Sequence, residues 1–257
     1  MTVDRQPLKA VFFDFGDTLW HFPAPPPDGV VERALRRRVN ALFSLWGVRP
    51  ARSAEEISRG MFQAREEAQR VADASDFRSP NYHAIARRAA EEAGLSPDHA
   101  QVSALWEAHN AGGPLLGRRI LDDTHETLEW LLERGFRVGA ITNRAHGGES
   151  FLAELQYHDL LRYFEVVSSS DQVGWRKPHR RIFQHALGAL GVAPAESALV
   201  GDRPEADVRG ARAMGMTAIL MRGVSPPDRV PQAPDEEPDY TIDSLSELRQ
   251  LPPFARA

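Results

Sequence analysis

Apolar positions follow two different spacings along the chain, and the change between them divides the sequence into segments of two kinds. Residues 8–15 form a nearly continuous apolar run that ends in the turn sequence Gly16-Asp17-Thr18, which is typical of a strand buried on both faces of a parallel sheet. The next apolar positions recur at helical spacing in four successive segments, which cover about 28–46, 53–74, 81–93 and 96–110. No strand pattern separates these segments, so they predict a self-contained helical insert.

From residue 121 onward, short apolar runs alternate with helical patterns. We expect strands over about 136–141, 164–168, 198–200 and 217–221, with helices between them. This alternation is the signature of a doubly wound sheet. The chain is therefore predicted to have an α/β fold, with a Rossmann-like, doubly wound, mainly parallel sheet and an inserted all-α cap domain. Residues 1–20 and 118–257 form the predicted core, and residues 21–117 form the predicted cap.

Polar residues gather directly after the predicted strands, where ligands bind in sheets of this kind. Carboxylates, a hydroxyl, an amide and an ammonium meet there, on Asp14, Asp17, Thr142, Asn143, Lys177, Asp202 and Asp207. Clustered carboxylates need a counter-charge, and hard oxygen ligands favour Mg²⁺. A phosphate that bridges the metal ion and the ammonium would satisfy these groups, because phosphoryl transfer is catalysed mainly by positioning and charge neutralisation. An Asp in this setting can attack phosphorus.

Charge and composition exclude several classes of protein and of functional site. The 31 basic and 36 acidic residues are interspersed and give a net charge of −5, which provides no electrostatic footprint for nucleic acid or an anionic membrane. With no Cys, disulfides, thiolate zinc sites and cysteine nucleophiles are excluded. No apolar stretch has the length of a membrane span or the form of a signal peptide, so we expect a soluble, cytoplasmic protein. Only Lys9 and Lys177 are lysines, and a lysine in such an arginine-rich chain indicates a site that needs a compact charge.

Four short motifs together resemble those of the haloacid dehalogenase (HAD) superfamily. They occur in the order and with the spacing that suit this superfamily, and they read Phe13-Asp14-Phe15-Gly16-Asp17-Thr18-Leu19, Ile141-Thr142-Asn143, Lys177-Pro178 and Gly201-Asp202-Arg203-Pro204-Glu205-Ala206-Asp207. The resemblance covers the predicted core. Residues 21–117 resemble the cap of the superfamily only in position and helix content.

The resemblance implies a Mg²⁺-dependent phosphohydrolase that acts on a small phosphorylated metabolite, a phosphate monoester, through an aspartyl-phosphate. Asp14 would be the nucleophile. Thr142, Asn143 and Lys177 would bind the phosphoryl group. The protein would be a monomer or homodimer that binds neither nucleic acid nor membranes.

The same resemblance implies a metal site and reveals one departure from the pattern. Asp14, the backbone carbonyl of Gly16 and Asp202 would hold Mg²⁺, and Asp207 would orient these ligands. Phosphatases of the superfamily usually carry an Asp, the general acid, at the position of Gly16. Asp17, one residue further on, is a possible general acid, although an adjacent side chain points elsewhere.

The absence of an acid at position 16 leaves two alternatives to a phosphohydrolase. A dehalogenase-like enzyme would use Asp14 on a carbon centre and would need neither a proton donor nor a metal ion. A catalytically weak phosphate-binding module would have kept the phosphate cradle and lost turnover. Asp202 and Asp207 argue against the dehalogenase, because a metal-free site has no reason to gather these acids.

Overall fold

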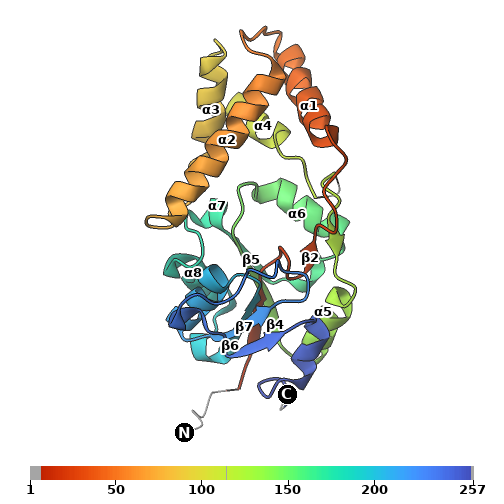
Figure 1. Ribbon diagram of the computed structural model, residues 1–257, viewed down its shortest axis with the longest axis vertical. Coiled ribbons are helices and arrows are strands. Elements are labelled where there is room, and N and C mark those ends of the chain that lie inside the picture. The colour runs from red at the N-terminus through yellow and green to blue at the C-terminus, as the bar shows by residue number, and fades with distance from the viewer. Residues whose placement is uncertain (1–6, 114, 256–257) are drawn as a thin grey trace.

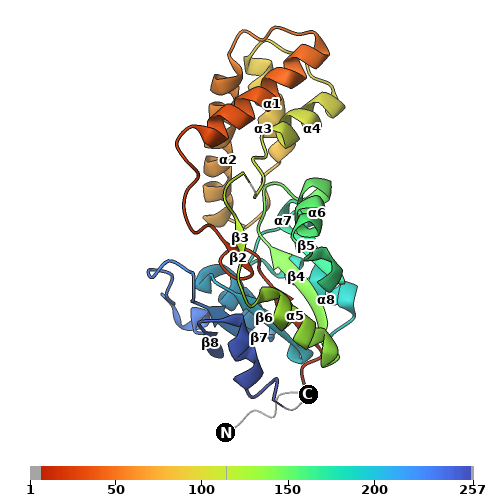
Figure 2. The ribbon, with the colours of Figure 1, turned by 90° about the vertical axis from the view of Figure 1, so that its right-hand side faces the viewer.

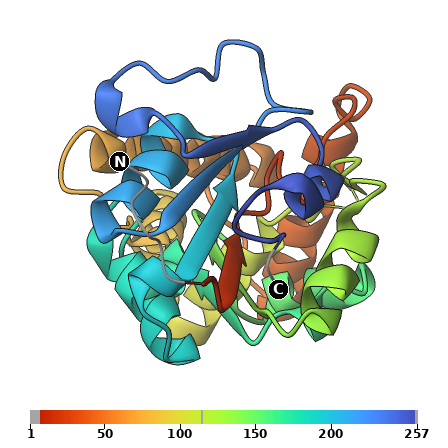
Figure 3. The same cartoon turned by 90° about the horizontal axis from the view of Figure 1, so that it is seen from below.

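A six-stranded sheet organises the part of the chain that the computed structural model describes, which is residues 7–113 and 115–255. The strands are all parallel and follow the order β5–β4–β1–β6–β7–β8 (Figure 3). Their bounds are β1 (Ala10–Phe13), β4 (Arg137–Thr142), β5 (Val166–Ser169), β6 (Ser197–Gly201), β7 (Thr217–Met221) and β8 (Tyr240–Ile242). The predicted α/β fold with a doubly wound, mainly parallel sheet is confirmed.

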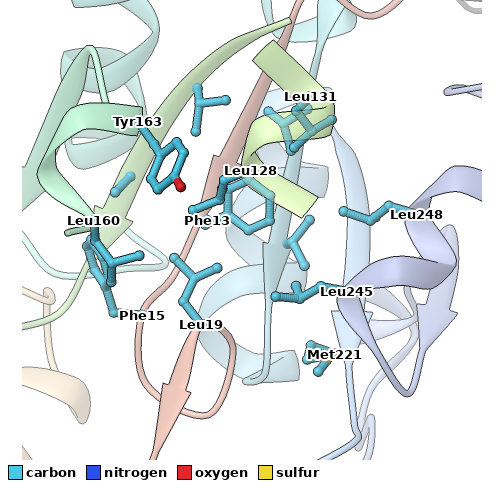
Figure 4. Packing of buried hydrophobic residues seen from close by; sticks show 14 of the residues in the cluster. Phe13, Phe15, Leu19, Leu128, Leu131, Leu160, Tyr163, Met221, Leu245 and Leu248 are labelled. Atoms are coloured by element: carbon cyan, nitrogen blue, oxygen red, sulfur yellow. The ribbon is translucent and has the colours of Figure 1, made fainter. Parts of the chain in front are cut away.

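Both faces of the central strand β1 are buried, because successive side chains of a strand point to opposite faces. Val11 and Phe13 pack into one apolar layer, and Phe12 packs into the other. Figure 4 shows Phe13 beside Leu128 in the first layer. The helices over this layer are α5 (Thr124–Glu133) and α6 (Gly148–Tyr157), and those over the second are α8 (Arg180–Leu190) and α9 (Arg209–Met214). Tight burial of β1 gives the residue that follows it, Asp14, a fixed position.

The helical insert stands beyond one end of the sheet (Figure 1). Its helices are α1 (Val30–Trp46), α2 (Ala54–Asp73), α3 (Tyr82–Glu92) and α4 (His99–Ala108), and their buried side chains form an apolar cluster of their own. The division into 1–20, 21–117 and 118–257 stays a prediction, and residues 1–6, 114 and 256–257 of it lie outside the described residues. None of the described helices combines the length and the apolar character needed to cross a membrane.

The structure contains short elements that the sequence patterns did not predict. Two strands, β2 (Trp20–His21) and β3 (Arg119–Ile120), pair antiparallel where the chain leaves and rejoins the sheet domain. A single helical turn, α7 (Ser170–Val173), follows β5. Elements of two to four residues are too short to show a periodicity. A π-helical turn, Pro204–Val208, precedes α9, and a 3-10 helix, Leu245–Gln250, follows β8.

The turn between α2 and α3 docks on the core. Arg176 Nε and Nη2 pair with the two carboxylate oxygens of Asp73 at 2.7 and 3.0 Å. The backbone N–H of Arg176 donates to the carbonyl of Phe77 at 2.8 Å, and that of Ser79 donates to Gly174 O at 3.0 Å. The helical insert is therefore attached to the core at this turn as well as through its two connecting segments.

His146, in the loop between β4 and α6, is a buried histidine where the helical insert meets the core. Its ring stacks on Trp106 of α4, with 4.2 Å between the ring centroids. Neither ring nitrogen has a hydrogen-bond partner among the described residues. Burial, reinforced by the charges of His109 and Arg65, lowers the pKa of His146 to about 3. The imidazole is therefore neutral at physiological pH.

The free energy of unfolding should fall as the pH drops from 7 to 5, because the unfolded chain then binds a proton at residue 146 that the folded protein does not bind. The unfolded histidine titrates near its ordinary pKa of about 6.5, so the loss at pH 5 amounts to about 2 kcal/mol. Urea unfolding of the wild type and of His146→Phe at pH 7 and at pH 5 measures this loss in the free energy of unfolding. His146→Phe keeps a stacked ring and should lose about 2 kcal/mol less than the wild type. Equal losses in the two proteins would show that His146 is not the source of this pH dependence.

Candidate active site

The residues predicted from the sequence come together at the carboxyl edge of the sheet, which faces the helical insert (Figure 2). Asp14 directly follows β1, and its backbone N–H donates to Val200 O at 2.9 Å, which continues the pairing with β6. Thr142 is the last residue of the neighbouring strand β4, and Asp202 directly follows β6. Asp207 lies in the π-helical turn after β6. The side chains of Asp14, Thr142, Asp202 and Asp207 are all buried.

Three of the carboxylates form a cluster that fits a metal ion. Asp14, Asp202 and Asp207 each offer one ligand atom within 4.8 Å of the others. One buried oxygen of each, namely Oδ1 of Asp14, Oδ2 of Asp202 and Oδ1 of Asp207, faces a cationic side chain and has no further hydrogen-bond donor among the described residues. Buried carboxylates this close repel one another, and hard oxygen donors suit Mg²⁺. The donor set is therefore compatible with the predicted cofactor.

Lys177 is the counter-charge of this cluster. Its Nζ lies 2.9 Å from Asp14 Oδ1 and 2.6 Å from Asp207 Oδ1, and it donates to the carbonyl of Ile141 at 2.7 Å. The side chain is only 2% exposed. Burial alone would lower the pKa of Lys177, but the Asp14 and Asp207 carboxylates outweigh burial and raise it. The ammonium is therefore held in its charged form between two acids.

Asn143 holds the backbone of Lys177. Its Nδ2 donates to Lys177 O at 3.2 Å, and its Oδ1 accepts the Lys177 N–H at 2.8 Å. Both ends of the amide are engaged in these bonds. The side chain thus positions Lys177, and the phosphate contact expected of Asn143 stays a prediction.

Asp17 has a partner that the sequence did not indicate. Its backbone is left-handed, with φ of 49°, and its Oδ2 lies 2.9 Å from Nη1 of Arg229. The same nitrogen contacts Oδ2 of Asp202. Arg229 lies in the Pro-rich segment between β7 and β8, where nothing local distinguishes it from the many other arginines. The general-acid role of Asp17 stays a prediction. In this structure its carboxylate faces a guanidinium, which favours the ionised form over the protonated form that an acid needs.

Arg144, two residues beyond Thr142, is a second cation that the motifs did not indicate. Its guanidinium lies 3.7 Å from the ring centroid of Phe151, and its Nη2 lies 3.5 Å from Glu154. Burial and the nearby charge of Arg118 lower the pKa of Arg144 to about 10, although Glu154 and Asp14 act in the opposite direction. Arg144 is therefore a buried positive charge within electrostatic range of Asp14.

A polar cleft of about 660 Å³ lies between the helical insert and the core. Tyr82, His83, Trp106 and Glu107 line it from the insert. The core contributes residues of the loop after β4, of α6 and of α7, including Gly147, Glu149, Ser150, Asp171 and Gln172. These residues follow β4 and β5, so the cleft lies on the same side of the sheet as the carboxylate cluster, although none of Asp14, Lys177, Asp202 and Asp207 lines it.

Comparison with known proteins agrees with the motifs. Residues 8–215 match the family model described as haloacid dehalogenase-like hydrolase. Over 247 residues the chain is 32% identical to a glyceraldehyde 3-phosphate phosphatase of Methanopyrus kandleri, covering 94% of this chain and 95% of that protein. It is 29% identical over 247 residues to a ribulose-1,5-bisphosphate 5-phosphatase of Halopiger xanaduensis, with 94% and 98% covered.

Solved structures of similar proteins include both reaction types of the superfamily. A 2-haloacid dehalogenase from Pseudomonas syringae pv. Tomato DC3000 superposes with a TM-score of 0.66 at 27% identity, covering 97% of this chain and 99% of that one. A HAD phosphatase from Thermococcus onnurineus superposes with a TM-score of 0.58 at 26% identity, with 95% and 97% covered. Similarity of fold therefore does not distinguish phosphate hydrolysis from dehalogenation, and that distinction must come from the side chains of the site.

Replacing Lys177 by Met should strongly destabilise the metal-free protein, because two buried carboxylates lose their shared partner. Removing one member of a buried ion pair typically costs about 3–5 kcal/mol. Urea unfolding at pH 7 in the presence of EDTA measures the loss. Lys9→Met is the matched control, since the other lysine of the chain makes an exposed ion pair with Glu196 and should change stability little. Equal effects of the two substitutions would show that Lys177 does not stabilise the cluster.

Proposed function

This chain belongs to the haloacid dehalogenase-like hydrolase family and is a hydrolase of the phosphatase type, and we propose that it hydrolyses a small phosphate monoester with Mg²⁺ through an aspartyl-phosphate on Asp14. The observation that carries the proposal is the buried cluster of Asp14, Asp202 and Asp207 with Lys177 between two of its carboxylates. Such a cluster would provide a nucleophile, a metal site and a counter-charge within a few ångströms of one another.

In the proposed reaction, a carboxylate oxygen of Asp14 attacks phosphorus and the bond from phosphorus to the ester oxygen breaks, so that the ester oxygen leaves with the electron pair and takes a proton from water. A water molecule then attacks phosphorus of the aspartyl-phosphate and breaks its bond to the carboxylate oxygen, which releases inorganic phosphate, with both protons of that water, and restores the carboxylate. Lys177 and Thr142 would bind the phosphoryl oxygens, and the ammonium would neutralise part of their charge. Asp14, Asp202, Asp207 and the carbonyl of Gly16 would hold Mg²⁺, which when bound supplies further positive charge to the phosphoryl group.

The substrate class is proposed from the relatives and from the cleft. The relatives are named for phosphatases of glyceraldehyde 3-phosphate and ribulose 1,5-bisphosphate, both small phosphorylated metabolites. The cleft of about 660 Å³ has room for a leaving group of this size. We therefore expect substrates of a few carbon atoms.

A dehalogenase-like reaction is the second candidate, because Gly16 offers no proton donor and a 2-haloacid dehalogenase shares the fold. It would need no metal ion, however, and it leaves the gathering of Asp202 and Asp207 around Asp14 without a purpose. Assays for phosphate release from phosphate esters and for halide release from 2-haloacids, each with Mg²⁺ and with EDTA, distinguish the two.

Asp14→Asn should abolish phosphate release and leave the fold intact, because the amide keeps the shape of the carboxylate but cannot attack phosphorus. Phosphate release and circular dichroism measure the two effects. Mass spectrometry of acid-quenched wild type should show one added phosphoryl group, which the variant lacks. Activity within about tenfold of the wild type, roughly 1.4 kcal/mol of barrier, would remove Asp14 from this role.

Gly16→Asp should increase turnover of alkyl phosphates and change hydrolysis of p-nitrophenyl phosphate little. A positioned acid contributes on the order of 10²–10⁴-fold, and it helps most where the leaving oxygen is most basic. The backbone permits the change, because φ of Gly16 is not positive and its Cβ would meet no described atom within 4 Å. Gly16→Asn is the matched control, since it has the same size and no proton to give. If Gly16→Asp is folded and binds Mg²⁺ but hydrolyses alkyl phosphates no faster than the wild type, the absence of a general acid at position 16 does not limit turnover.

A further inference from the structure

The segment between β7 and β8 reaches back to the carboxylate cluster. Its residues 222–239 project beside the sheet (Figure 2). From this segment the guanidinium of Arg229 contacts Asp17 and Asp202. The backbone forms a turn here, in which the Arg229 N–H donates to Pro226 O at 3.0 Å. Pro226 and Pro227 lie within the turn and Pro231 follows it, and the fixed φ of these prolines limits the backbone freedom of the segment. The segment that carries the Arg229 guanidinium therefore has a restricted backbone conformation.

Arg229 contacts a carboxylate of the cluster that would hold the metal ion. Its Nη1 contacts Oδ2 of Asp202, the oxygen that accepts no hydrogen bond from the rest of the described chain. The Asp202 carboxylate is 2% exposed, so it cannot rely on water for its stabilisation. The ammonium of Lys177 pairs with Asp14 and Asp207, which leaves Arg229 as the counter-ion of Asp202 in the described structure.

We propose that Arg229 is an internal counter-ion that competes with the metal ion for Asp202. Binding of a divalent cation would displace the guanidinium from Oδ2 of Asp202, and Asp17, 2.9 Å from the same Nη1, would retain it at the edge of the site. The inference rests on the proposed Mg²⁺ site, and it gives Asp17 the role of a second anchor for Arg229.

Competition between Arg229 and the metal ion for Asp202 would have two linked consequences. Without metal, the contact stabilises the folded protein, because a buried carboxylate keeps a partner. With metal, the same contact must be broken, so the apparent affinity for Mg²⁺ is reduced by the fraction of molecules in which Arg229 occupies Asp202. Removing the guanidinium should therefore weaken the metal-free protein and tighten metal binding.

Isothermal titration of metal-free protein with MgCl₂ tests the proposal. Arg229→Gln should bind Mg²⁺ about tenfold more tightly than the wild type, because the metal ion then no longer has to displace a guanidinium from Asp202. The gain is limited because Arg229 is itself 33% exposed, which weakens its contact with the carboxylate. Arg222→Gln is the matched control, because Arg222 lies on the same segment and makes only an exposed ion pair with Asp243, 3.4 Å away. It should bind Mg²⁺ as the wild type does.

Thermal unfolding provides a second measurement. Arg229→Gln should unfold at a lower temperature than the wild type in EDTA, and saturating Mg²⁺ should remove most of that difference. Equal or weaker Mg²⁺ binding by Arg229→Gln would overturn the competition and leave the metal site in place. If neither the wild type nor Arg229→Gln binds Mg²⁺, the proposed metal site and the competition both fail.

Discussion

Electrostatic repulsion among the carboxylates at the carboxyl edge of the sheet is the constraint that the rest of the structure must meet. Asp14, Asp202 and Asp207 offer oxygens within 4.8 Å of one another. At an effective dielectric constant of about 20, two unit charges at such a distance repel by on the order of 3 kcal/mol. Lys177 and Arg229 offset part of this repulsion. The remainder is held by the fold, whose buried strands do not let the acids move apart.

Apolar burial is what gives the acids fixed positions. The residues of β1 and β6 are buried on both faces, so the backbone at Asp14 and Asp202 is determined by packing. Lys177 is held differently, from two sides. Asn143 binds its backbone from the core, while the neighbouring Arg176 pairs with Asp73 of the helical insert. The insert therefore contributes to the position of the ammonium as well as covering the site.

The features that the sequence predicted are those with a local signal. The continuous apolar run before Asp14, the helical spacings of the insert and the acids after the strands each occupy a short stretch of chain, and the structure contains the corresponding elements. The contact between Arg229 and Asp17 joins residues 212 positions apart in a segment without periodicity, so only the tertiary fold reveals it. The strands β2 and β3 were missed for a related reason, since two residues carry no pattern.

Gly16 and Arg229 together describe how the proposed site would work. A glycine at position 16 leaves no side chain beside the nucleophile, and Asp17 faces a guanidinium. In this structure the charged side chains around Asp14 are therefore arranged to stabilise charge, and Asp17 is paired with a cation. Lys177 is buried between two acids that favour its charged form, whereas Arg229 lies on a surface segment and, on our proposal, exchanges its partner. If the site works by charge stabilisation, the full positive charge is needed only when substrate is bound, and an exchangeable cation would let the same acids remain buried before a metal ion binds.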